Sequence, residues 1–229
     1  ALQAHPGHPA LLLSLAVLLQ SVGRNREAAE KMDSMADRFT ANPNALFNHV
    51  RALWSAGRLE EAEQLGGRAA SLFPTHYAIF FIRLYMLLFS GRAEEAYGMA
   101  QDRARLPTGI AEEEISYVGR IARAIASPTP PSVAEAIEET SRRARLGTGL
   151  AENGIQFAAA LGRPDLSFAW LEALFFSRGF VVPDIRFTAA QGTFTPRDDR
   201  MTIFLFNPAM SGLRGMPAFA RITQELGLC

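Results

Sequence analysis

Apolar positions recur along the first half of the chain in a way that predicts paired helices. They stand at the same phase in three successive segments: Leu12, Leu46 and Phe80, and again Leu19, Leu53 and Leu87. Such recurrence is typical of helices that each bury one face against a neighbour. We therefore predict an all-α chain whose core uses the same helix positions in each segment.

Short polar segments interrupt this pattern at a constant interval. Residues 23–28, 57–62 and 91–96 read alike, and each segment begins 34 residues after the previous one. The glycine that opens each segment suits the left-handed conformation that ends a helix and reverses the chain. The alanine five residues later leaves room for a close helix crossing, and the glutamate before it complements the dipole of the helix that begins there. The segments predict the turns between paired helices.

With Ala69 and Pro74 added to these positions, residues 9–108 resemble tetratricopeptide repeat (TPR) proteins, in which a pair of helices recurs every 34 residues. The resemblance implies an α-solenoid, a right-handed superhelix of about five helix pairs over the whole chain. A single pair of this kind cannot bury its apolar face until a neighbour stacks on it. In this interpretation Pro74 ends the second helix of the second pair.

Between residues 109 and 178 the period weakens without vanishing. Gly162 lies 71 residues after Gly91, which is two periods plus three residues. One divergent pair, with a proline-rich joint in place of the glycine turn, and one further pair fit this interval. We expect their helices at about residues 111–126, 132–145, 150–161 and 164–177.

The last part of the chain changes character twice. Residues 179–205 break the helical period and favour β-branched and aromatic residues, which predicts an irregular insertion, either a small β-hairpin or an ordered loop. It either covers apolar surface of the last repeat or contacts a ligand. Residues 206–229 read as a helical cap, with helices opened by Pro208 and Pro217 and closed by Gly227. We treat residues 1–229 as a single domain.

This C-terminal pattern is similar to bacterial transcriptional regulators that join an N-terminal winged-helix or cyclase-type domain to degenerate TPRs. The matching residues are Gly162, Asp165, Phe168, Trp170, Leu171, Phe206, Pro208, Leu213, Arg214, Pro217, Phe219, Leu226 and Gly227. The resemblance implies a sensory or interaction part, with DNA binding or catalysis located outside it. Residues 179–205 depart from the pattern, because a shorter link is expected between the two matched blocks.

Composition fits a globular chain without affinity for nucleic acid. The 229 residues are 48% hydrophobic, and 23 basic residues balance 23 acidic ones. A large core can form, and no general attraction to a polyanion results, so we expect no direct nucleic-acid binding. The single cysteine, Cys229, excludes an intrachain disulfide. Residues 10–19 are too short to span a bilayer, and we interpret them as a buried helix rather than a signal-peptide core.

The sequence offers little that would support catalysis. It contains no GxGxxG after a strand, no GxxxxGK[ST] and no GxSxG. His5 and His8 have no carboxylate near them in sequence, so no metal site is expected there. His49 and His76 fall within predicted repeats and are interpreted as structural. We expect a chain without catalytic residues, metal or cofactor.

The candidate binding site lies on the first helices of the predicted pairs, which line the concave side of such superhelices. The residues on one phase of these helices are Asn44, Phe47, Asn48, Arg51, Trp54, Phe81, Tyr85 and Leu88. Aromatic walls and a guanidinium suit a peptide or short helix with an apolar anchor and an acidic group. Alternatively, the aromatic residues belong to the core between repeats or are covered by residues 179–205.

Two hypotheses of function follow. The first is a non-catalytic cytoplasmic module that binds a protein or peptide partner in the concave groove. The second is the ligand-sensing part of a bacterial transcriptional regulator, with a small-molecule effector held between the repeats and residues 179–205. The chain begins with Ala1 inside a repeat-like segment, so we expect it to be part of a longer protein.

Overall fold

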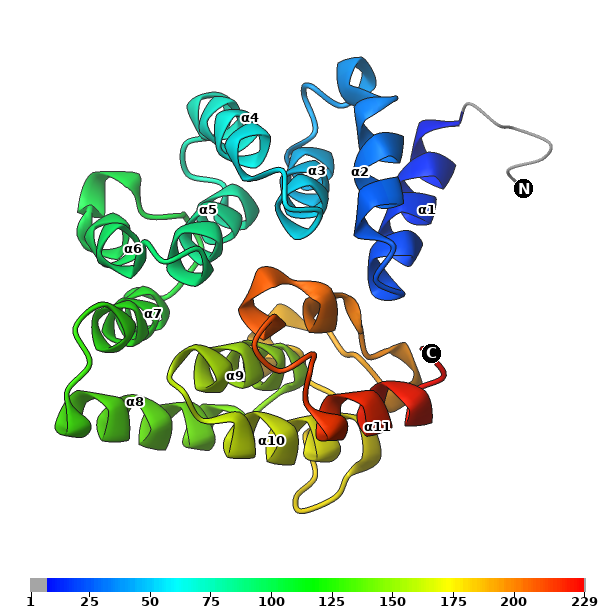
Figure 1. The fold of residues 1–229 in the computed structure, drawn as a ribbon. Helices are drawn as coiled ribbons and strands as arrows, with labels where there is room; N and C mark the ends of the chain where they lie inside the picture. The colour runs from blue at the N-terminus through cyan, green and yellow to red at the C-terminus, as the bar shows by residue number, and fades with distance from the viewer. Residues whose placement is uncertain (1–7, 229) are drawn as a thin grey trace. The chain divides into compact units, whose positions relative to one another are not determined.

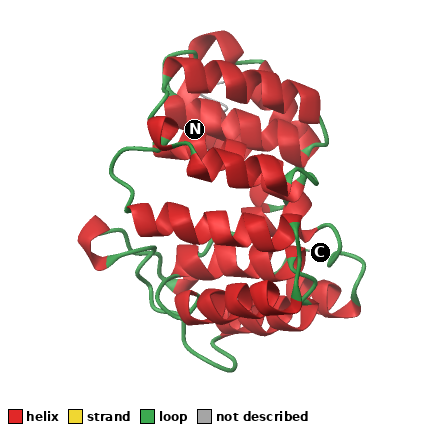
Figure 2. Ribbon diagram, turned by 90° about the vertical axis from the view of Figure 1, so that its left-hand side faces the viewer, coloured by secondary structure: helices red, strands yellow, loops and turns green. Residues whose placement is uncertain are grey.

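The computed structural model describes residues 8–228, and it is all-helical (Figure 1, Figure 2). The α-helices are α1 Pro9–Ser21, α2 Asn25–Asp33, α3 Pro43–Ser55, α4 Leu59–Leu72, α5 Tyr77–Phe89, α6 Ala93–Gln101, α7 Glu112–Ala126, α8 Pro130–Arg143, α9 Thr148–Ala160, α10 Pro164–Phe176 and α11 Pro217–Glu225. Short 3-10 helices are η1 Ala36–Arg38, η2 Arg103–Arg105, η3 Ala189–Gln191, η4 Arg197–Asp199, η5 Ile203–Phe206 and η6 Pro208–Met210. No strand forms between residues 8 and 228. The prediction of an all-α chain is confirmed.

The chain divides into two compact units. Unit 1 consists of Ala1–Ala122 together with Leu205–Pro208. Unit 2 consists of Arg123–Phe204 together with Ala209–Cys229. The division falls inside α7, and not at residue 109, where the sequence period weakens.

Successive helices of unit 1 pack as hairpins. Helix α1 contacts α2, α3 contacts α4, and α5 contacts α6. The chain reverses within each hairpin at a glycine in the left-handed conformation: Gly23, Gly57 and Gly91 have φ values of 78°, 84° and 80°. This conformation explains why a glycine stands at each of the three turns. Because α3 also contacts both α1 and α5, the first helices of the three hairpins follow one another in space (Figure 1).

The core of unit 1 forms where the helices cross. The alanines of the three repeated segments, Ala28, Ala62 and Ala96, are completely buried. Of the predicted large core residues, the buried ones are Leu19, Leu46, Leu53 and Phe80, and the half-buried ones are Leu12 and Leu87. The sequence pattern therefore identifies the core of this unit, in which small residues permit close crossings and large ones fill the space between helices.

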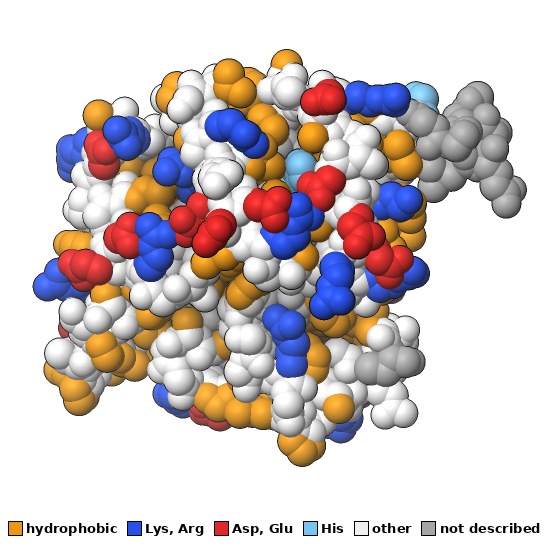
Figure 3. Space-filling view, turned by 45° about the horizontal axis from the view of Figure 1, so that its top comes forward, with side chains coloured by type: hydrophobic (Ala, Val, Ile, Leu, Met, Phe, Trp, Pro, Cys, Tyr) orange, Lys and Arg blue, Asp and Glu red, His pale blue; other side chains and the backbone are white. Residues whose placement is uncertain are grey.

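The arginine after each repeated glycine links its hairpin to carboxylates. Arg58 donates to both oxygens of Glu61 at 2.7 and 2.6 Å, and to Asp33 on the preceding α2 at 2.5 Å. Arg92, one period later, likewise reaches back to Glu63 on α4. Acidic and basic side chains alternate in a band across the face shown in Figure 3. Single exposed pairs stabilise little, so we infer that these contacts mainly align one hairpin with the next.

Unit 2 is built from α8, α9, α10 and α11, each packed on the next. Gly154 permits the close approach, because a Cβ there would lie 3.1 Å from Thr140 in α8 and 3.4 Å from Trp170 in α10. The turn between α9 and α10 repeats the glycine of unit 1, with Gly162 at a φ of 74°. Helices α7 to α10 begin and end within two residues of the expected bounds.

The insertion is an ordered loop. Ile185 and Phe194 form one isolated antiparallel bridge, so of the two predicted forms the β-hairpin is not confirmed. The loop docks on the start of α9, where Thr148 N donates to Ile185 O and Gly149 N donates to Arg186 O, both at 2.8 Å. The first N–H groups of a helix have no partner inside that helix, and here the loop backbone supplies partners.

Arg200 fixes the middle of this loop from inside. Its side chain is 3% exposed. Its Nη2 donates to Val182 O at 2.8 Å and to the Asp184 carboxylate at 2.9 Å, and its Nη1 donates to Leu174 O at the end of α10. Of the two roles considered for the insertion, these contacts favour that of a cover over α9 and α10.

The chain ends with the helices opened by proline that the sequence predicts. Pro208 opens η6, Pro217 opens α11, and Gly227 follows with a φ of 71°. Helix α11 packs on α10, and Arg221 of α11 pairs with Glu172 of α10 at 2.6 Å. Helix α11 therefore covers part of the last hairpin of unit 2.

Candidate functional site

The predicted groove residues on α3 and α5 fall into two groups. Trp54 and Leu88 are each 2% exposed and lie in the interior. The other six are exposed or half-buried, and we refer to them as the α3/α5 face: Asn44, Phe47, Asn48, Arg51, Phe81 and Tyr85. The sequence allows these residues to be either groove or core. Their burial assigns Trp54 and Leu88 to the core, and the α3/α5 face remains as a candidate surface.

Arg51 is oriented by side chains of α1 and α3. Its Nε donates to Gln20 Oε1 at 2.9 Å, and its Nη2 donates to Asn48 Oδ1 at 2.6 Å. The guanidinium lies 5.0 Å from the centre of the Phe47 ring. Asn48 is held in turn, because its Nδ2 donates to the Asn44 carbonyl at 2.7 Å. The α3/α5 face therefore carries a guanidinium whose direction is fixed before any ligand binds.

Aromatic rings connect this face to the interior. The rings of Phe81, Tyr85 and Phe89, four residues apart on α5, have centroids 5.7 and 5.9 Å apart in succession. Phe89 then stacks on Trp54 at 6.4 Å, and Trp54 Nε1 donates to Ser90 Oγ at 3.2 Å. Burial raises the pKa of the Tyr85 hydroxyl. The row thus supplies rigid apolar walls on the face and a well-packed support beneath it.

A segment from far along the chain, Leu205–Pro208, packs on the same unit. Asn25 Nδ2 donates to the Phe206 carbonyl at 3.2 Å, and Ser55 Oγ donates to Asn207 Oδ1 at 3.0 Å. Ser55 continues a polar stripe on α3: Asn44, Asn48, Arg51 and Ser55. Ser55 is not among the predicted groove residues, although its position four residues after Arg51 puts it on the same side of the helix. Unit 1 thus already holds a short segment from the junction of η5 and η6 at the end of this stripe.

The packing of the Phe206 ring on unit 1 can be tested by substitution of Gly23. A Cβ at Gly23 would lie 2.8 Å from Cδ1 of the Phe206 ring, whereas nothing lies within 4 Å of a Cβ at Gly57. Both glycines have positive φ, so alanine at either position costs about 1–2 kcal/mol in backbone strain. We expect Gly23→Ala to destabilise unit 1 by about 1–3 kcal/mol more than Gly57→Ala, because the ring must also move. Urea denaturation followed by circular dichroism measures the difference.

Removing the ring provides the control for this comparison. In a Phe206→Ala background the two alanine substitutions should cost the same, because the obstacle at Gly23 is gone. Equal costs with Phe206 in place would contradict the observed contact.

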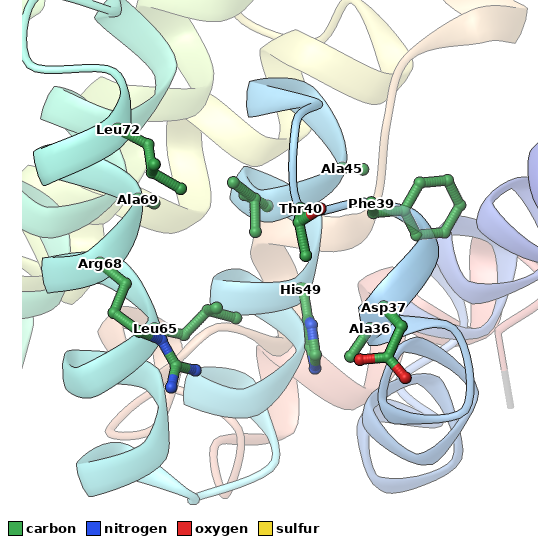
Figure 4. A pocket seen from close by; sticks show the side chains of 11 residues that line it. Ala36, Asp37, Phe39, Thr40, Ala45, His49, Leu65, Arg68, Ala69 and Leu72 are labelled. Carbon is green, nitrogen blue, oxygen red and sulfur yellow. The ribbon is translucent and has the colours of Figure 1, made fainter.

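A surface cavity of about 310 Å³ lies between η1, α3 and α4 in unit 1 (Figure 4). His49, in its wall, is 7% exposed. Its Nε2 contacts Asp33 at 2.9 Å, and Arg58 contacts the other oxygen of Asp33 at 2.5 Å. Burial alone would raise the pKa of the Asp33 carboxyl. Hydrogen bonds from Arg58 and His49 outweigh this effect and hold that pKa below its usual range. Burial lowers the pKa of His49, so the imidazole is neutral at pH 7.

Other candidate sites are sparse in the part of the chain that the structure describes. A second cavity of about 300 Å³ lies where α6 is joined to α7, and the ion pair between Arg103 and Glu112, at 2.6 Å, forms part of its wall. No three side chains of His, Cys, Asp or Glu within residues 8–228 could hold a metal ion together. None of the helices in that range combines the length and apolar character that crossing a membrane requires. His5 and Cys229 lie outside the described residues.

Comparisons with protein families, with curated proteins and with solved structures found no match to this chain. Its function must be inferred from the chemistry of its own residues.

Proposed function

We propose that the chain is a non-catalytic cytoplasmic interaction module, a TPR-type right-handed superhelix whose α3/α5 face binds a segment of a partner protein. Support for the repeat comes from the 34-residue interval between Gly23, Gly57 and Gly91 and from their shared left-handed conformation. The contacts that α3 makes with α1 and α5 are those expected when such hairpins stack.

The observation that carries the binding function is the way unit 1 holds Leu205–Pro208. One bond goes from Asn25 to a main-chain carbonyl, and another goes from Ser55 to a side-chain amide. Bonds to main-chain groups hold a peptide whatever its side chains are, and neighbouring pockets then choose among sequences. A surface with these groups can hold a second segment farther along the same stripe, toward Asn44.

The remainder of the α3/α5 face favours a particular kind of segment. Phe47 and Phe81 offer aromatic surface for an apolar anchor, which is the part of a peptide that usually contributes most to affinity. Arg51, oriented by Gln20 and Asn48, offers a positive charge and suits a carboxylate near that anchor. The proposed ligand is therefore an extended segment that carries an aromatic or large aliphatic residue followed or preceded by Asp or Glu.

Binding of matched pairs of peptides, which differ only in one charge, tests the proposal. Fluorescein-labelled nine-residue peptides would carry one Phe and one Asp at every spacing, and each would be matched by a peptide with Asn in place of Asp. We expect the Asp member of at least one pair to bind more tightly by fluorescence anisotropy. Arg51→Gln should weaken that binding about 5- to 30-fold, because a charge-assisted hydrogen bond is lost.

Arg26 provides the matched control, since it is an exposed arginine on α2 outside the α3/α5 face. Arg26→Gln should leave the affinity unchanged. The proposal fails if no peptide binds, if the Asp and Asn members bind equally, or if the two arginine substitutions have equal effects.

A second candidate function is the ligand-sensing part of a bacterial transcriptional regulator. The observation that favours it is the cavity beside His49, in which apolar walls and charged side chains occur together. A sensor of this kind would carry its DNA-binding domain elsewhere in the protein.

A further inference from the structure

The cavity between η1, α3 and α4 combines features of a small-molecule site. Its volume of about 310 Å³ lies at the lower end of the range for ligand pockets, so its occupant would be small. The lining consists of Ala36, Asp37, Phe39, Thr40, Ala45, Leu46, His49, Leu65, Arg68, Ala69 and Leu72. These residues come from three consecutive segments of unit 1, and none belongs to the α3/α5 face.

The walls are mostly apolar. Leu46 and Leu65 in the lining are buried, and Leu72, at the end of α4, is 60% exposed. Isolated exposed leucines are common on protein surfaces, but here Leu72 borders an apolar hollow that a ligand side chain can enter. An aliphatic or aromatic group of a few carbon atoms fits these walls.

Charges of opposite sign line the same cavity. Figure 4 shows Arg68 on one side, Asp37 on the other and His49 between them. Within residues 8–228, neither Arg68 nor Asp37 forms an ion pair or a side-chain hydrogen bond, so both can bind a ligand. A guanidinium on one side suits a carboxylate, and a carboxylate on the other suits an ammonium group.

His49 adds a hydrogen-bond acceptor. Asp33 accepts from Nε2 at 2.9 Å, which places the ring proton on Nε2 and leaves Nδ1 as the acceptor of this neutral imidazole. An acceptor in the wall suits an N–H donor of the ligand and does not suit a second carboxylate. His49 and Asp37 together therefore favour a cationic donor group opposite Arg68.

We propose that this cavity binds a free apolar α-amino acid, with its carboxylate on Arg68, its ammonium group toward Asp37 and His49, and its side chain against Leu46, Leu65 and Leu72. The proposal does not rest on peptide binding at the α3/α5 face, since the two sites share no residue. It gives unit 1 a second binding site, for a small metabolite.

Calorimetry with L-leucine and L-phenylalanine on the full chain tests the site. We expect at least one of them to bind. For phenylalanine, two analogues separate the charged contacts: 3-phenylpropionate lacks the ammonium group, and phenethylamine lacks the carboxylate. Each analogue should bind about tenfold or more weakly than the amino acid, because each loses one charge-assisted contact.

Substitutions of exposed residues then locate the site. Arg68→Gln should weaken binding of the amino acid about tenfold or more, and Thr40→Trp should abolish it by filling the cavity. Arg26→Gln is the control and should change nothing. Because Thr40 and Arg68 are exposed, the variants should keep the melting temperature of the unsubstituted chain, which shows that they fold.

Three results would overturn the proposal. They are the absence of binding by both amino acids at millimolar concentration, equal binding of phenylalanine and phenethylamine, and unchanged binding in both Arg68→Gln and Thr40→Trp. None of these results bears on the peptide assay, in which Arg51→Gln is the decisive variant.

Discussion

Replacing Trp54 with alanine is expected to destabilise unit 1 by about 3–5 kcal/mol. The indole is 2% exposed, stacks on Phe89 and donates to Ser90 Oγ. Its removal leaves a cavity between α3 and α5 and an unpaired hydroxyl, and neither can be repaired by a small shift of one helix. Urea denaturation followed by circular dichroism measures the loss.

Two further variants make this result specific. Trp54→Phe keeps an aromatic ring but loses the hydrogen bond, so it should cost less than Trp54→Ala. Leu18→Ala, at a side chain that is 61% exposed, should cost no more than about 0.5 kcal/mol. If Trp54→Ala were as mild as Leu18→Ala, Trp54 would be a surface residue, and the original interpretation of it as a groove wall would regain support.

The second large effect is expected at Arg200. Arg200→Met keeps an extended side chain but removes the donors that bond Val182 O, Leu174 O and the Asp184 carboxylate. Buried carbonyls without donors are costly, so unit 2 should lose about 2–4 kcal/mol of stability. Trp170 is buried in α10 and reports on the unfolding of unit 2 by fluorescence once Trp54 has been replaced with phenylalanine.

Trypsin offers an independent measurement of the same change. Residues 179–204 contain Arg186 and Arg197, which become cleavable when the loop leaves α9 and α10. Arg200→Met should therefore be cut much faster than the unsubstituted chain. Arg197→Met, at an exposed position in η4, removes one cleavage site without disturbing the loop and should not accelerate cleavage at Arg186.

The sequence predicts what depends on local requirements. A left-handed turn needs glycine, so Gly23, Gly57 and Gly91 fix the hairpins, and a close crossing needs a small residue, so Ala28 and Ala62 mark the core. The same logic located α7 to α10 within two residues, although the period there is weak. Features that a single turn or crossing imposes can be recognised from sequence alone.

The candidate site was harder to predict because small differences in helix phase decide burial. Arg51 and Trp54 are three residues apart on α3, and Tyr85 and Leu88 are three apart on α5, yet one member of each pair is half-buried and the other is interior. Phase alone does not separate them, because burial depends on how neighbouring helices cross. The distribution of these residues between face and core follows only from the packed structure.

Contacts between distant segments were beyond the reach of any local pattern. Nothing near Phe206 in the sequence indicates that it packs against Gly23, and nothing near Arg200 points to the carbonyls of Leu174 and Val182. The cavity beside His49 could not be predicted for a related reason: its walls come from three segments, and the sequence of each one is typical of a repeat helix or turn. Contacts and cavities formed by distant segments become visible only in the three-dimensional structure.

The packing of Leu205–Pro208 on unit 1 has a consequence for the synthesis of the protein. Unit 1 includes residues up to Ala122 and then this segment, so about 80 residues of unit 2 are translated before unit 1 can be completed. Translation proceeds at about 5–20 residues per second, so helices α1 to α6 are synthesised roughly 4–16 seconds before Leu205–Pro208. During that interval Gly23, Asn25 and Ser55 remain uncovered on the ribosome. A ribosome-bound chain that ends before residue 205 should therefore be an aggregation-prone intermediate that a chaperone can capture.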